Sequence, residues 1–78
     1  MVQIKAEIPT PEAVEDLKAK IKRLNSKAGQ MKMDLHDLAE GLPNDYQKLL
    51  DEAAKTYEIY HELDELKKQL KAWERQLQ

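Results

Sequence analysis

Residues 14–42 read VEDLKAKIKRLNSKAGQMKMDLHDLAEGL, and the spacing of the apolar residues in this stretch decides the fold. These residues follow one another at alternating intervals of three and four without a break, and we call them the first seam. Its members are Val14, Leu17, Ile21, Leu24, Ala28, Met31, Leu35, Leu38 and Leu42. Such a heptad pattern keeps one helix face turned toward a partner helix over its whole length.

The sequence also marks both ends of this first helix. Thr10 is suited to accept hydrogen bonds from the first free amides, and Pro11 suits the first helical position. At the other end, Gly41 can adopt the left-handed conformation that often ends a helix, and Pro43 blocks continuation. We therefore predict a helix over about 11–41.

A second helix should follow almost at once. Asn44 is a good helix cap, and Gln47 is placed to complete a capping box on it. The connection is then only about three to five residues long, and so short a connection makes the two helices antiparallel neighbours. We predict the second helix over about 46–76.

The apolar residues of the second helix fall into two registers rather than one, which predicts a shift of its buried face near Tyr60. At that point Tyr57 and Tyr60 should face the small residues Ala28 and Gly29. The first register contains Leu50, Ala53, Tyr57 and Tyr60, and the second contains Ile59, Leu63, Leu66, Leu70, Trp73 and Leu77.

One hairpin would leave much of its apolar surface in water, because two helices touch along a single seam. A second copy would cover that surface. The predicted fold is therefore all-α: a hairpin over 11–78 that forms a four-helix bundle by homodimerisation, with parallel and antiparallel arrangements both open. Residues 1–10 alternate apolar and polar, and we expect a flexible or loosely docked arm there. The expected dimer core is Leu24, Ala28, Met31, Leu35, Tyr57, Tyr60 and Leu63.

Composition excludes several classes of protein. The formal charge of −2 gives no overall attraction to nucleic acid, and the absence of cysteine excludes disulfides and thiolate sites. The sequence shows neither a secretory signal nor an apolar run long enough to span a membrane, so we expect a cytoplasmic protein. With no Gly-rich phosphate loop, and no histidine placed to activate Ser26, we expect no enzyme activity.

Two further groups of residues are candidates for binding a metal ion or RNA. His36 and Glu40 stand four apart on one helix face, which predicts a weak divalent-metal site, although no cofactor is required. A basic cluster in the first helix falls on several faces, which favours a solvated, ion-pairing surface over an RNA-binding one. The cluster consists of Lys18, Lys20, Lys22, Arg23 and Lys27.

The run DLHDLAEGLP at residues 34–43 resembles the small Rop-like proteins encoded among nitrogen-fixation genes, a family of unknown function. The resemblance implies an accessory role in nitrogenase maturation or cofactor handling, exerted by binding a nitrogenase assembly protein. Alternatives are an RNA-binding bundle of the Rop type and a small metal-binding helper. Within this run the seam and the turn do not require the polar residues, which makes these the candidates for contacting a partner. They are Asp34, His36, Asp37 and Glu40.

Overall fold

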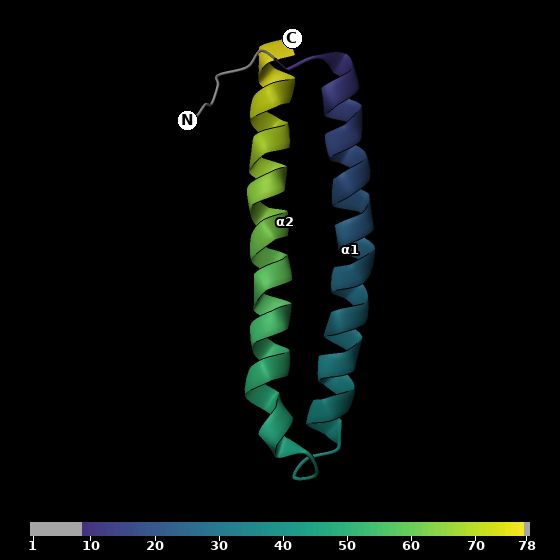
Figure 1. Ribbon diagram of the computed structural model, residues 1–78, viewed down its shortest axis with the longest axis vertical. Coiled ribbons are helices and arrows are strands. Elements are labelled where there is room, and N and C mark those ends of the chain that lie inside the picture. The colour runs from purple at the N-terminus through teal and green to yellow at the C-terminus, as the bar shows by residue number, and fades with distance from the viewer. Residues whose placement is uncertain (1–8, 78) are drawn as a thin grey trace.

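The computed structural model describes residues 9–77, and these form two long helices that run antiparallel to each other (Figure 1). Helix α1 spans Pro11–Glu40, a short 3-10 helix η1 spans Tyr46–Lys48, and helix α2 spans Leu49–Leu77. Within the described range there is no strand. The predicted all-α hairpin is confirmed, whereas most of the expected arm at residues 1–10 lies outside the described residues.

The start of α1 follows the prediction. The hydroxyl oxygen of Thr10 accepts a hydrogen bond from the backbone N–H of Ala13 at 3.0 Å. Thr10 itself has extended backbone angles, φ −97° and ψ 159°, and Pro11 occupies the first helical position. One of the four amides that a helix start leaves without a partner is thus satisfied by a side chain.

The predicted left-handed conformation of Gly41 is wrong. Gly41 has φ −84° and ψ −1°, and its N–H donates to the backbone carbonyls of Asp37 and Leu38, both at 3.2 Å. The last turn of α1 therefore continues in right-handed geometry through this residue. The left-handed position comes four residues later, at Asp45 with φ 60°, a residue type that tolerates this conformation better than most.

The expected capping box on Asn44 does not form. Asp45, and not Asn44, precedes η1, and its side chain makes no capping hydrogen bond. Instead, the backbone N–H of Lys48 donates to the carbonyl of Asp45 at 2.9 Å, which closes a tighter turn than an α-helical one. The connection between the helices, residues 41–45, still has the predicted length.

The predicted shift of register in α2 is also wrong, because the buried face of α2 repeats at intervals of three and four along its whole length. Two polar residues, Glu52 and Thr56, hold inward positions, and the hydroxyl of Thr56 donates to the carbonyl of Glu52 at 2.8 Å. This local bond satisfies a buried hydroxyl without a partner on α1. We call the inward positions the second seam: Leu49, Glu52, Thr56, Ile59, Leu63, Leu66, Leu70 and Trp73.

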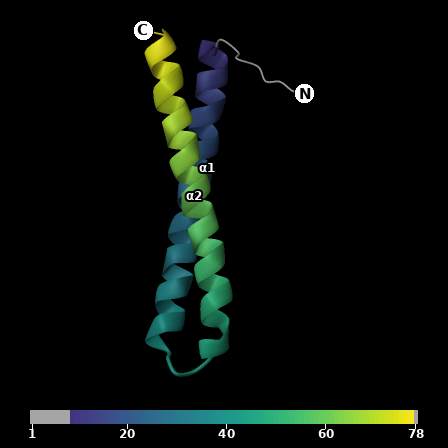
Figure 2. The same ribbon diagram turned by 90° about the vertical axis from the view of Figure 1, so that its left-hand side faces the viewer.

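The hairpin is a single layer of helices. Its smallest dimension is 15 Å against a length of 51 Å, and the thinness is evident from the side (Figure 2). Globular domains usually close their core with a second layer, so both broad faces of this hairpin are open. The core between the helices is correspondingly small and consists of Leu17, Ile21, Ala28, Ile59 and Leu63.

Replacing Leu63 by alanine should destabilise the protein strongly. Its side chain is only 2% exposed at the centre of the core. Leu63→Ala should lower the free energy of unfolding by about 2–5 kcal/mol, because it removes buried methyl groups and leaves a cavity. Met33→Ala, at a position 55% exposed, should change it by less than about 0.5 kcal/mol. Urea unfolding at one fixed protein concentration measures both, and equal losses would contradict this assignment of the core.

Candidate functional site

Large apolar side chains are exposed mainly in the half of the hairpin that contains the turn. Leu50 is 84% exposed and Tyr57 is 68% exposed. An exposed cluster of this kind on a small protein commonly marks a binding surface. The exposed large apolar residues in this half are Met33, Leu42, Tyr46, Leu50, Tyr57 and Tyr60, whereas Leu77 lies at the open end.

Two aromatic side chains on α2 are held in place at the surface. The ring of Tyr57 stacks on the imidazole of His61, with centroids 5.9 Å apart and planes 9° from parallel. The hydroxyl of Tyr60 reaches across to α1 and donates to the carbonyl of Ala28 at 3.5 Å. The prediction that Tyr57 and Tyr60 both face Ala28 and Gly29 is therefore confirmed for Tyr60 and Ala28 and wrong for Tyr57, whose side chain is turned out to solvent.

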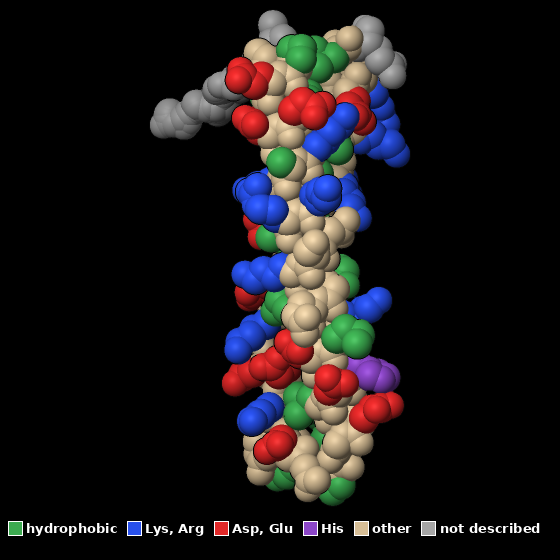
Figure 3. All heavy atoms as spheres, turned by 90° about the vertical axis from the view of Figure 1, so that its right-hand side faces the viewer, with side chains coloured by type: hydrophobic (Ala, Val, Ile, Leu, Met, Phe, Trp, Pro, Cys, Tyr) green, Lys and Arg blue, Asp and Glu red, His purple; other side chains and the backbone are tan. Residues whose placement is uncertain are grey.

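The polar residues predicted to contact a partner all lie on the surface of α1 near the turn. The imidazole Nε2 of His36 is 3.3 Å from the Oε2 of Glu40, with both side chains well exposed. Asp34 accepts a hydrogen bond from the side-chain amide of Gln30 at 2.9 Å, and Asp37 is exposed beside them. Figure 3 shows a histidine among acidic side chains toward the turn end of this face. The face is thus acidic and accessible.

The two predicted metal ligands are brought together, but the described part of one chain adds no third. Within residues 9–77, no cluster of three His, Cys, Asp or Glu side chains has the geometry to hold a metal ion. His36 and Glu40 therefore offer one nitrogen and one carboxylate from a solvated position. Two protein ligands leave most of the coordination shell to water or to a second molecule.

The residues predicted for a dimer core fall into three groups. Ala28 and Leu63 are already buried within one hairpin, so their burial stabilises the single hairpin itself. Tyr57 is exposed on α2, and Tyr60 is exposed although its hydroxyl reaches α1. Half-buried between these extremes are Leu24, Met31 and Leu35.

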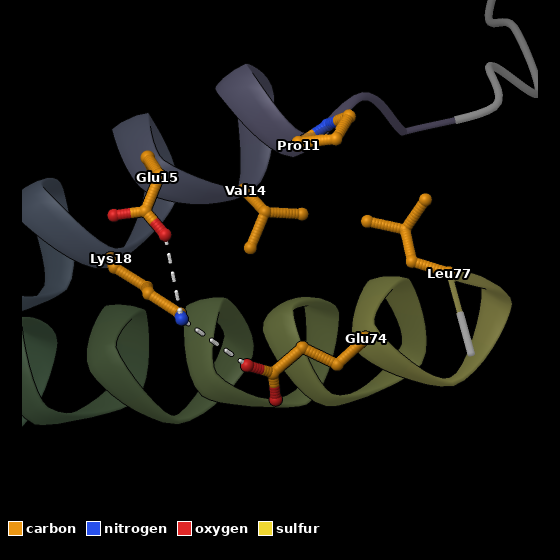
Figure 4. A pocket seen from close by; sticks show the side chains of 6 residues that line it. All are labelled: Pro11, Val14, Glu15, Lys18, Glu74 and Leu77. Atoms are coloured by element: carbon orange, nitrogen blue, oxygen red, sulfur yellow. Dashed lines mark ion pairs between the residues drawn. The ribbon is translucent and has the colours of Figure 1, made fainter.

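Ion pairs on the hairpin surface follow the expected pattern in part. The ammonium group of Lys18 lies 3.6 Å from a carboxylate oxygen of Glu15 and 3.6 Å from one of Glu74, which joins α1 to α2 beside a shallow hollow at the open end (Figure 4). On α2, a hydrogen bond from Lys68 to Asp64, together with the negative charge of that carboxylate, raises the pKa of Lys68. All three ion pairs are solvated and contribute little to stability.

The exposed apolar side of α2 differs from the sequence prediction. Leu50, Ala53 and Tyr57 were expected in the seam, yet all three are exposed. The inward face could have been found by extending the three-and-four spacing of Ile59, Leu63 and Leu66 backwards to positions 56 and 52. Those two positions hold polar residues, so the hydrophobic pattern alone does not mark them as inward.

No helix in the described part of the chain is long and apolar enough to cross a membrane.

A single layer of two long antiparallel helices defines a helical-hairpin protein. The profile of the Rop-like family matches residues 12–75, and the chain belongs to that family. A crystal structure of a DUF683-family protein from the cyanobacterium Cyanothece 51142 superimposes with a TM-score of 0.83 and 73% identity, covering 85% of this chain and 93% of that one.

Relatives at high identity carry family names without an activity. A UPF0437 protein of Nostoc sp. is 71% identical over 62 residues, which is 80% of this chain and 87% of the relative. A UPF0437 protein of Trichormus variabilis is 63% identical over 76 residues, or 96% of this chain and 88% of the relative. A UPF0437 protein of Frankia alni, 50% identical over 44 residues (56% of this chain and 54% of the relative), is named for its place in the nifX-nifW intergenic region.

Proposed function

We propose that this chain is a non-enzymatic, cytoplasmic accessory protein that assists nitrogenase maturation or cofactor handling by binding another protein. The observation that carries the proposal is the exposed acidic end of α1, where Asp34, His36 and Glu40 stand in solvent and play no part in the core. The nitrogen-fixation context comes from the relative in Frankia alni, whose name places it between nifX and nifW.

The acidic end of α1 is poorly explained by the stability of the helix alone. Asp37 and Glu40 lie in its last turn, where the carbonyl ends of the backbone make the local potential negative, and that turn contains no basic residue. Carboxylates at this position repel the helix dipole. A partner that supplies positive charge would remove this repulsion, so we place the binding site for the assembly protein here.

Binding at this end should depend on the polar side chains and not on charge in general. A His36→Ala/Glu40→Ala variant used as bait in extracts of nitrogen-fixing cells should lose most of a partner that the wild-type chain retains. The matched control is Glu12→Ala/Asp16→Ala, which changes two exposed residues at the same spacing at the far end of α1. Mass spectrometry of the retained proteins compares the three baits. Equal recovery by all three would rule the site out, and recovery that disappears after ribonuclease treatment would favour the RNA-binding alternative.

The accessory protein is proposed to act as a homodimer that closes a four-helix bundle. Support comes from the single helix layer and from the small set of side chains buried within it. Met31, Leu35 and Leu38, which continue the first seam toward the turn, are only half-buried. A second hairpin laid on an open face would cover apolar surface that one hairpin leaves in water.

Sedimentation equilibrium at micromolar concentration should give about twice the chain mass of 9.1 kDa. The physical reason is that burying the open apolar face is favourable in proportion to the area removed from water. A folded species at the mass of one chain over the whole concentration range would contradict the homodimer.

A second candidate function, that of a metal-binding helper, rests on the 3.3 Å pair of His36 and Glu40. Nickel or zinc titrated calorimetrically into the tag-free protein should show weak binding that is lost in His36→Ala and kept in His61→Ala. Binding should also weaken at acidic pH, because protons compete with the metal for the imidazole nitrogen. Indistinguishable isotherms for wild type and His36→Ala would leave the pair without a role in metal binding.

A further inference from the structure

One side of α2 carries a row of exposed residues that begins at the turn and follows the helix beside the second seam. The members on α2 are three or four residues apart, so they lie along one face of that helix, and Tyr46 in η1 continues the row toward the turn. We call this row the outer stripe. From the turn onward it consists of Tyr46, Leu50, Ala53, Tyr57, Tyr60 and Asp64.

The hairpin beneath the outer stripe is weakly packed. Glu52 and Thr56 occupy the inward positions of α2 at this level, and the fully buried core begins only at Ile59. In residues 50–57 of α2, apolar side chains thus face solvent while two polar side chains face α1. Burial within one chain does not account for this arrangement, because Leu50 and Tyr57 are the most exposed large apolar residues described.

We infer that the outer stripe is the contact with a second copy of this chain, with α2 packed antiparallel against α2 of the partner copy. The inference rests on the homodimer proposed above and names its surface and register. A two-fold axis passing midway between Ala53 and Tyr57 sets Ala53 against the second copy's Tyr57, and Leu50 against its Tyr60. Each contact occurs twice by symmetry, and a large residue meets a smaller one in each.

The register follows from what each alternative would leave unpaired. A shift by one heptad is the smallest that keeps the stripe in contact. Moved toward the open end, the contact would set Leu50 against Lys67 and Ala53 against Asp64 of the second copy. Moved toward the turn, it would set Tyr60 against Pro43, which lies in the turn itself and not on a helix. Of the three registers, only the central one pairs every member of the outer stripe with another member, and it sets Leu50, Ala53, Tyr57 and Tyr60 against one another.

The ends of the stripe fit the same arrangement. Tyr46 at one end comes opposite Asp64 of the second copy at the other, so a phenol hydroxyl meets a carboxylate that can accept a hydrogen bond. In one chain that carboxylate is exposed, and its Oδ2 lies 3.0 Å from the Nζ of Lys68. The contact from residue 46 to residue 64 would extend over about 28 Å at a rise of about 1.5 Å per residue.

Cysteine cross-linking tests the register directly, because the chain contains no cysteine of its own. Leu50→Cys and Tyr60→Cys chains are mixed, allowed to exchange and oxidised, and intact mass spectrometry identifies the products. The expected product is the mixed disulfide, since the two positions face each other. Two Leu50→Cys chains should not cross-link, because their cysteines lie about 15 Å apart along the helices and a disulfide needs Cα atoms within about 7 Å. Met33→Cys measures random collision.

A second measurement separates this inference from the homodimer itself. Tyr57→Asp should shift the sedimenting species to the mass of one chain, whereas Met33→Asp, which places the same charge at an exposed position of α1, should remain dimeric. Circular dichroism confirms that both variants are helical. A wild-type monomer would overturn both proposals. A wild-type dimer that survives Tyr57→Asp, or that cross-links Leu50→Cys to itself, would overturn only the outer stripe and its register.

Discussion

Burial of one narrow apolar seam between two antiparallel helices is the interaction on which the rest of this structure depends. The seam is closed tightly by Leu17, Ile21, Ala28, Ile59 and Leu63 and only loosely beyond them toward the turn. Because a single layer of helices encloses so little, both broad faces remain open to solvent. Every proposal about function concerns how one of these surfaces is used.

The two helices divide the surface between them near the turn. α1 presents carboxylates and His36, while α2 presents the aromatic and aliphatic side chains of the outer stripe. The outer stripe consists of side chains of α2, whereas the proposed partner site consists of side chains of α1, so the two proposals concern different helices. Substitutions on α1 and on α2 therefore test the two proposals separately.

Much of the fold could be predicted because it depends on periodicity and on helix-end chemistry. The unbroken spacing of the first seam, the Thr10-Pro11 start and the short connection lead to an antiparallel hairpin with little room for alternatives. The accessible polar residues near the turn could be predicted for the same reason, since positions outside a seam face water. These features are local, and local spacing along one helix determines them.

The tertiary structure was needed where the spacing of residues allowed a position to face either the other helix or solvent. Thr56 lies inside because its hydroxyl bonds to the carbonyl of its own helix at 2.8 Å, a possibility that hydrophobicity alone does not reveal. Once Thr56 is inside, Leu50, Ala53 and Tyr57 turn outward together, since all of them belong to one rigid helix. The choice between Gly41 and Asp45 for the left-handed turn residue likewise depended on how the two helix ends meet. The apolar residues at positions 50–60 of α2 indicated burial in the sequence. Only the packing of α2 against α1 decided which face of α2 remained open to solvent.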